Sequence, residues 1–192
     1  MRADARRNHE AVLLAADEVF SEEGISAPID EVARRAGVGV GTVYRHFPTK
    51  EALFEAIVMA RMEQLADRTE ELANWPDPAQ ALFTHISEIT ELAVSKKDLV
   101  DELERWGMKP SEKVQADLKN RLWQAGQGLL RRAHEAGAVR SDVSYDDLAA
   151  MIMGVCEGAC CPMVDPPRRP ELAKRMTEVL CAGLRACAAH GT

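Results

Sequence analysis

Side chains that can hold an anion gather in one short stretch of the chain, residues 41–50. A hydroxyl, a phenol, an imidazole and two cationic groups follow one another there: Thr42, Tyr44, Arg45, His46 and Lys50. Such groups donate hydrogen bonds to phosphates, and an arginine also reaches the edge of a guanine. The residue types and their spacing therefore predict contact with the backbone of a nucleic acid.

The cysteines offer a second chemistry. Cys156 and Cys160 lie one helical turn apart, and Cys161 follows at once. Two of these thiols could bind a metal together with His85 or His134, or could oxidise as a sensor. No C-x-x-C pair is present, however, and a buried free cysteine is common as a small hydrophobic residue. We therefore expect no metal site, and a metal- or thiol-sensing role through Cys156 and Cys160 remains an alternative.

Catalytic patterns are not found in the sequence. It has no nucleophile elbow, no glycine-rich phosphate loop and no H-E-x-x-H pair. The acidic residues near position 101 form a charge run that is typical of an exposed helix. We therefore expect no enzyme activity and no cofactor.

The stretch around the anion-holding side chains predicts the scaffold that they need. Residues 28–50 read PIDEVARRAGVGVGTVYRHFPTK, in which helices expected over 29–36 and 40–46 flank a glycine-containing turn. Two short helices joined by a tight turn form a helix-turn-helix, whose second helix can enter a major groove. Val43 and Phe47, four residues apart, are expected to anchor that second helix.

Helical periodicity continues through the rest of the chain. A first helix is expected over 8–23, and Thr49 can cap a long fourth helix. Further apolar stripes at helical spacing follow, one of them opened by Ser144 with Asp147 three residues on, a variant of the capping box. No segment shows sustained β-branched alternation, so we expect an all-α protein of about nine helices.

Composition and charge do not oppose this interpretation. The 192 residues carry a net charge of −7, but residues 1–50 contribute only −1 and residues 51–192 the other −6. The longest apolar run, 148–156, is far shorter than the roughly 18 residues of a membrane span. The odd number of cysteines, five, indicates no disulfide framework, and a reducing cytoplasm is the expected location.

The N-terminal part resembles the TetR family of bacterial transcriptional regulators. The family signature runs I-A-x-x-A-G-V, then G-T-x-Y-x-H-F-x-x-K-E-x-L, and this chain carries the matching positions at Val32, Ala33, Ala36, Gly37, Val38, Gly41, Thr42, Tyr44, His46, Phe47, Lys50, Glu51 and Leu53. The resemblance implies a three-helix DNA-binding domain in residues 1–50. It also implies a six-helix ligand-binding and dimerisation domain in residues 51–192.

Individual DNA contacts follow from the same resemblance. Those to the phosphate backbone are implied for Thr42, Tyr44, His46 and Lys50. Gly41 and Arg45 would approach bases or phosphates. Val40 stands where many members have a polar or basic residue, and facing DNA it would pack on a thymine methyl group.

The last two helices are expected to join two copies of the chain. They span about 144–161 and 168–189 and contain small residues that let helices approach closely: Gly154, Gly158, Ala159, Ala182, Gly183 and Ala186. A four-helix bundle with a two-fold mate would bury both apolar stripes. A homodimer would read a palindromic double-stranded DNA operator, with half-sites about one helical turn apart or somewhat more.

The middle helices supply aromatic and thioether side chains that suit an apolar cavity. The candidates are Met59, Phe83, Ile86, Trp106, Met108, Trp123, Met151 and Met153. Each of them would serve equally well in plain core packing. We expect a ligand-responsive repressor with a small apolar or aromatic effector; the alternative is a helical small-molecule-binding or interaction protein with a vestigial helix-turn-helix.

Overall fold

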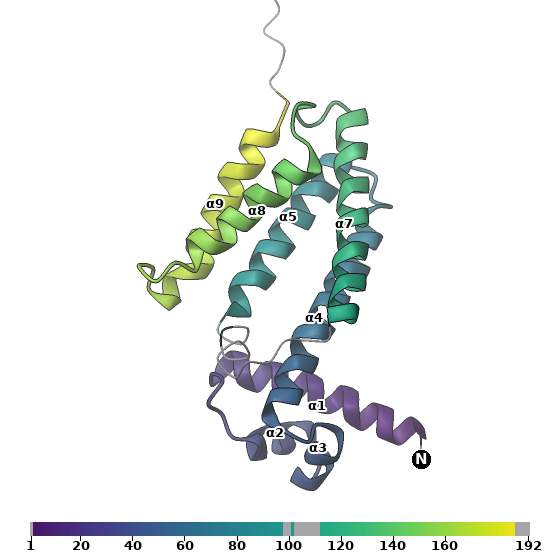
Figure 1. Cartoon of the computed structure of the whole chain (residues 1–192), viewed down its shortest axis with the longest axis vertical. Coiled ribbons are helices and arrows are strands. Elements are labelled where there is room, and N and C mark those ends of the chain that lie inside the picture. Colours follow the sequence, from purple (N-terminus) through teal and green to yellow (C-terminus); the bar gives the residue numbers. More distant parts are fainter. Residues whose placement is uncertain (1, 98–100, 102–111, 187–192) are drawn as a thin grey trace, which may run out of the picture. The chain divides into compact units, whose positions relative to one another are not determined.

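The computed structural model describes residues 2–97, 101 and 112–186, and this part of the chain is almost entirely helical (Figure 1). It contains eight α-helices and one 3-10 helix: α1 Arg2–Glu22, α2 Ile29–Ala36, α3 Val40–His46, α4 Lys50–Leu72, α5 Pro78–Ser95, α7 Glu112–Glu135, α8 Tyr145–Ala159, η1 Pro166–Arg168 and α9 Arg169–Leu184. The only strand-like feature among these residues is an isolated antiparallel bridge between Val139 and Arg185. The predicted all-α fold is confirmed, with eight of the expected nine or so α-helices in the described part.

Local signals set most of the helix ends. Gly37 ends α2 with φ +68°, a left-handed conformation that glycine adopts without strain, and its N–H bonds back to the last turn. The hydroxyl oxygen of Thr49 accepts from the N–H of Ala52 at 3.1 Å, so Thr49 caps α4 as expected. Ser144 and Asp147 form a complete capping box at the start of α8. Two ends differ: α1 begins at Arg2, six residues before the expected start, and α9 ends at Leu184 rather than near residue 189.

The chain divides into two compact units, the first of which runs to Arg61. Its core draws residues from α1, α2 and α3, and also Leu53, Phe54 and Ile57 from the beginning of α4. Phe54 meets Phe20 edge-to-face, with 4.6 Å between ring centroids. The first two turns of α4 are thus part of the support for the three N-terminal helices, and the functional division at residue 50 stays a prediction.

The second unit takes in Met62–Lys97 and the chain from Lys113 onward. Helices α5, α8 and α9 pack against one another, as Figure 1 shows. Their shared core includes Leu82 and Ile86 of α5, Leu148 of α8 and Leu184 of α9. Burial of these apolar stripes accounts for the assembly of the unit, because helices of this length gain most of their stability from packing.

A buried polar chain crosses the core of the second unit. His85 is completely buried, with Nδ1 3.1 Å from the Thr69 hydroxyl and Nε2 3.4 Å from the Tyr145 hydroxyl. The Thr69 hydroxyl donates to the carbonyl of Leu65, so it accepts from His85 Nδ1–H, and Nε2 accepts from Tyr145. A Cβ at Gly126 would lie 2.0 Å from the Tyr145 hydroxyl oxygen, so only glycine lets α7 approach so closely.

Candidate nucleic-acid interface

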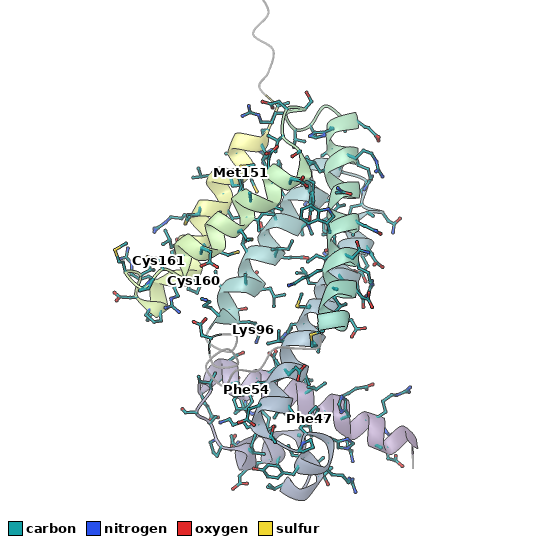
Figure 2. The ribbon with its side chains drawn as sticks, in the orientation of Figure 1. Phe47, Phe54, Lys96, Met151, Cys160 and Cys161 are labelled. Carbon is teal, nitrogen blue, oxygen red and sulfur yellow. The ribbon has the colours of Figure 1, made fainter. Side chains whose placement is uncertain are left out.

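Helix α3 is held by the two side chains that the sequence predicts as its anchors. Val43 is 1% exposed and Phe47 is 4% exposed, and both belong to the core of the first unit. His9 of α1 stacks on the Phe47 ring with 4.7 Å between centroids. Figure 2 labels Phe47 and Phe54 among the side chains of this unit. The helix therefore has one face fixed on its scaffold.

The opposite face of α3 points to solvent. Gly41, Tyr44 and Arg45 stand at i, i+3 and i+4, so they share one side of the helix, and all three are exposed. Tyr44 keeps 47% of its surface in contact with solvent, which is unusual for a large aromatic residue. A Cβ at Gly41 would meet nothing within 4 Å. A phenol and a guanidinium are thus presented on an unobstructed surface.

The other predicted contacts on α3 are less open. Thr42 is half-buried, and Val40 is half-buried and packs against the core of the first unit. His46 is also half-buried, and its ring lies edge-on to His9 at 5.6 Å. Its Nε2 is buried and finds no hydrogen-bond partner among the residues that the structure describes. Burial, and then the charge of His46, lower the pKa of His9.

The ammonium of Lys50 is engaged within the first unit. It donates to the carbonyl oxygen of Ala27 at 2.8 Å. It also lies 5.3 Å from the centroid of Phe20 and 5.6 Å from that of Phe54, positions that favour a cation over a ring. The structure thus gives Lys50 a role in joining α4 to the segment before α2, apart from Tyr44 and Arg45.

We expect Lys50→Met to lower the free energy of unfolding by about 1–2 kcal/mol, because the variant loses a charge-assisted hydrogen bond and two cation–π contacts while keeping the apolar stem. Urea denaturation followed by circular dichroism measures this change. The control is Arg45→Met, which removes an exposed charge and should change stability by less than about 0.5 kcal/mol. Equal stability of the Lys50 variant and the parent protein would contradict this role.

Acidic neighbours neutralise most of the other arginines of the first unit. Arg34 pairs with Glu31, and Arg35 pairs with Glu22 at 2.6 Å. These contacts raise the pKa of both guanidinium groups. Among the described residues of this unit, Arg45 makes no ion pair, so its charge remains available to a partner. The pair of Arg34 lies within α2, whereas Arg35 finds Glu22 on α1 only once the two helices pack.

The eight pocket candidates of the sequence analysis do not gather at one place. Ile86 is fully buried in the core of the second unit, and Trp123 is exposed on α7 with its ring edge-on to Tyr145. Met59 lies on the part of α4 that belongs to the first unit, and Met151 lies at the surface of α8 (Figure 2). Trp106 lies outside the described residues, as does Met108.

Among the candidates that the structure describes, Phe83 is the one that lines the larger cavity of the second unit, which lies between α5 and α9 and has a volume of about 750 Å³. Its lining is mainly apolar but includes hydroxyl groups from Ser87, Thr90 and Thr177. A shallow apolar groove lies between α8 and α9 and includes Met151. Met153 is exposed elsewhere on α8.

The cysteines do not form a reactive cluster in the described part of the chain. Cys160 is buried and Cys161 half-buried at the end of α8, where Figure 2 labels them. Burial raises the pKa of the Cys156 thiol to about 11, so its reactive thiolate form is scarce. Both ring nitrogens of His85 face protein hydroxyls, and no group of three His, Cys, Asp or Glu side chains that could hold a metal occurs among the described residues. The sensing alternative thus gains no support from this part of the structure.

Comparison with protein-family models decides the family. Residues 12–57 match the model described as bacterial regulatory proteins of the tetR family. Residues 77–186, more than half of the chain, match the model of the SbtR-like transcriptional regulator C-terminal domain. The chain belongs to the TetR family. The resemblance seen in the helix-turn-helix sequence is thereby confirmed.

Similar TetR-family proteins extend over nearly the whole chain. A TetR transcription regulatory protein from Mycobacterium vanbaalenii is 35% identical, with a TM-score of 0.74 over 96% of this chain and 98% of that one. A TetR regulator from Streptomyces coelicolor is 33% identical, with a TM-score of 0.72 over 94% of this chain and 99% of its own. The regulator UidR of Escherichia coli K12 is 27% identical over 162 residues, 82% of either chain. This protein is therefore a DNA-binding transcriptional regulator of the helix-turn-helix type.

The TetR family is one of regulators rather than enzymes. The curated relatives include proteins named as repressors, such as BepR of Brucella suis, which is 26% identical over 180 residues. Among the helices that the structure describes, none is both long enough and apolar enough to cross a membrane.

Proposed function

We propose that the protein is a cytoplasmic, homodimeric repressor that reads a palindromic operator through α3. The observation that carries the proposal is the exposed face of α3, where Tyr44 and Arg45 stand beside Gly41 and opposite the buried anchors. Arg45 is the candidate for base reading, because a guanidinium can bind a guanine edge through two hydrogen bonds. Tyr44 and Thr42 are candidates for phosphate contacts, and the bare backbone at Gly41 allows close approach.

Three predicted contacts take a different role in this proposal. The ammonium of Lys50 is engaged with the Ala27 carbonyl, so its contribution to DNA binding is to hold the start of α4 in place. The His46 ring braces α1 against α3 through His9, so its contribution to DNA binding is to position α3. Val40 packs against the core, so its main role is to support the turn between α2 and α3.

The expected result for DNA binding is a loss of roughly 5- to 150-fold in operator affinity for Arg45→Ala, the range found for one good base contact. Tyr44→Ala is expected to weaken binding to all sequences alike, since a phosphate contact carries no sequence information. Fluorescence anisotropy at fixed salt measures both effects, on genomic fragments selected by the purified protein. Arg131→Ala, an exposed arginine of α7, is the matched control. Unchanged affinity in both helix variants would overturn the assignment of α3 as the reading helix.

The proposed dimer forms through α8 and α9. The shallow groove between them is lined almost entirely by apolar atoms, from residues that include Met151, Gly154, Val179 and Leu180. Val179 is 73% exposed and Met153 is 65% exposed, so a lone chain would leave large apolar side chains in water. A second copy related by two-fold symmetry would cover the same surface on both chains.

Release from DNA is proposed to follow binding of an effector in the second unit. An effector changes the DNA-binding equilibrium only if it binds the two conformations of the dimer with different affinity. The second unit supplies a cavity large enough for a small organic molecule.

A further inference from the structure

The cavity between α5 and α9 has a floor of hydroxyl groups. Thr90 of α5 and Thr177 of α9 line it, and they are 2% and 3% exposed. Val94 and Ala173 add apolar surface beside them. The volume of about 750 Å³ lies within the range of sites that enclose small organic molecules.

Hydrogen bonding within the floor determines what it offers to a ligand. The Thr177 hydroxyl donates to the Thr90 hydroxyl oxygen at 3.0 Å. The Thr90 hydroxyl in turn donates to backbone carbonyls, at 3.1 Å from Ile86 O and 3.0 Å from Ser87 O. Each hydroxyl has one proton, and both are committed to protein acceptors. The floor therefore presents oxygen lone pairs, which favours a ligand that donates hydrogen bonds.

Charge around the cavity points to the same kind of ligand. Three carboxylates line it, Glu91, Glu171 and Glu178, against the two cations Lys174 and Arg185. None of the three carboxylates makes an ion pair with another residue of the described chain. The Arg185 guanidinium carbon lies 4.7 Å from the centroid of Phe83, so the aromatic wall already holds a cation.

We propose that this cavity binds an amphipathic organic cation, with its ammonium group toward the carboxylates and the Thr177 oxygen. Its apolar body packs against Phe83 and Val94, partly replacing the Arg185 guanidinium. The proposal rests on the proposed function, since it names the chemical class of the effector. It adds a positive charge to the small apolar or aromatic effector that the sequence suggests, because the hydroxyl floor and the glutamates come together only when α5 and α9 pack.

Three probes with one skeleton test the proposal: 4-phenylbutylamine, 4-phenylbutan-1-ol and 4-phenylbutanoate. Isothermal titration calorimetry at pH 7 on the full chain without DNA measures their affinities, so the outcome does not depend on operator binding. We expect the amine to bind at least about 5-fold more tightly than the alcohol, and the carboxylate to bind most weakly. Equal affinities, tighter binding of the carboxylate or no binding of the amine would overturn the proposal.

Variants locate the binding site. The double substitution Glu91→Gln with Glu178→Gln should reduce the preference for amine over alcohol by about threefold or more. Thr177→Val should lower the affinity for the amine. Glu157→Gln on α8 removes one carboxylate charge away from the cavity and should leave the preference unchanged. A preference that survives the double substitution, in protein shown to be folded by circular dichroism, also overturns the proposal.

Operator binding is then measured separately. If the protein binds its operator but does not bind the amine, the proposed regulatory function stands and the cation-site proposal is overturned. A protein that binds the amine with the expected variant effects supports the cation site, even where its operator affinity does not change.

Discussion

Replacing Val179 with aspartate is expected to convert the dimer into a monomer and to weaken operator binding by at least about 100-fold. Val179 is 73% exposed in the groove between α8 and α9, where the proposed two-fold interface would bury it. A carboxylate in that place would lose its hydration without a partner, which is costly. The operator affinity falls because two linked DNA-binding units bind with an affinity roughly 10²–10⁴ higher than one unit alone, through effective concentration.

Light scattering coupled to size-exclusion chromatography gives the mass, and anisotropy gives the operator affinity. Ala116→Asp on α7 is the matched control, since Ala116 is exposed outside this groove. It should remain dimeric with unchanged affinity. A Val179→Asp protein that still runs as a dimer would show that the two copies meet elsewhere, and a monomeric parent protein would exclude the dimer altogether.

Acidification from pH 7 to pH 4 is expected to cost the native state about 3 kcal/mol through His85 alone. Burial lowers the pKa of His85 from 6.5 to about 4. Between pH 6.5 and pH 4 the His85 imidazole is protonated in the unfolded chain but neutral in the folded chain. The stability contributed by the neutral imidazole is therefore fully present above pH 6.5 and is lost as pH falls toward 4, by up to about 1.4 kcal/mol per pH unit.

Urea denaturation at several pH values measures this dependence, and His85→Gln serves as the reference because glutamine does not titrate. Other groups, such as Asp142 with its pKa lowered to about 2 by Arg140, act equally in both proteins and cancel in the difference. The variant should be less stable at pH 7 and show a shallower fall toward pH 4. Parallel curves would mean that His85 is protonated in the folded protein without cost.

The helix-turn-helix was predictable from sequence because its determinants are local. The spacing of Val43 and Phe47, the left-handed glycine at position 37 and the Thr49 cap each act within about one helical turn. The same spacing places Tyr44 and Arg45 opposite the anchors, so the exposed face of α3 also follows from the sequence.

The hydrogen-bond partners of several polar side chains lie on other segments of the chain, and sequence periodicity does not predict such contacts. Lys50 donates to the carbonyl of Ala27, 23 residues earlier, a contact that its position in the signature does not suggest. His85 becomes a buried, neutral base because α4 and α8 bring hydroxyls to both of its nitrogens.

Sequence alone therefore determined the helical elements and the surface that α3 presents, since the hydrogen bonds and side-chain spacings that set them lie within single turns. Tertiary structure alone decided where the second unit is hollow and what lines that space. The Thr90–Thr177 hydrogen bond joins residues 87 positions apart, and the proton commitments that make the cavity floor an acceptor exist only after α5 and α9 pack. Such a property belongs to the contact between two helices, and neither helix shows it by itself.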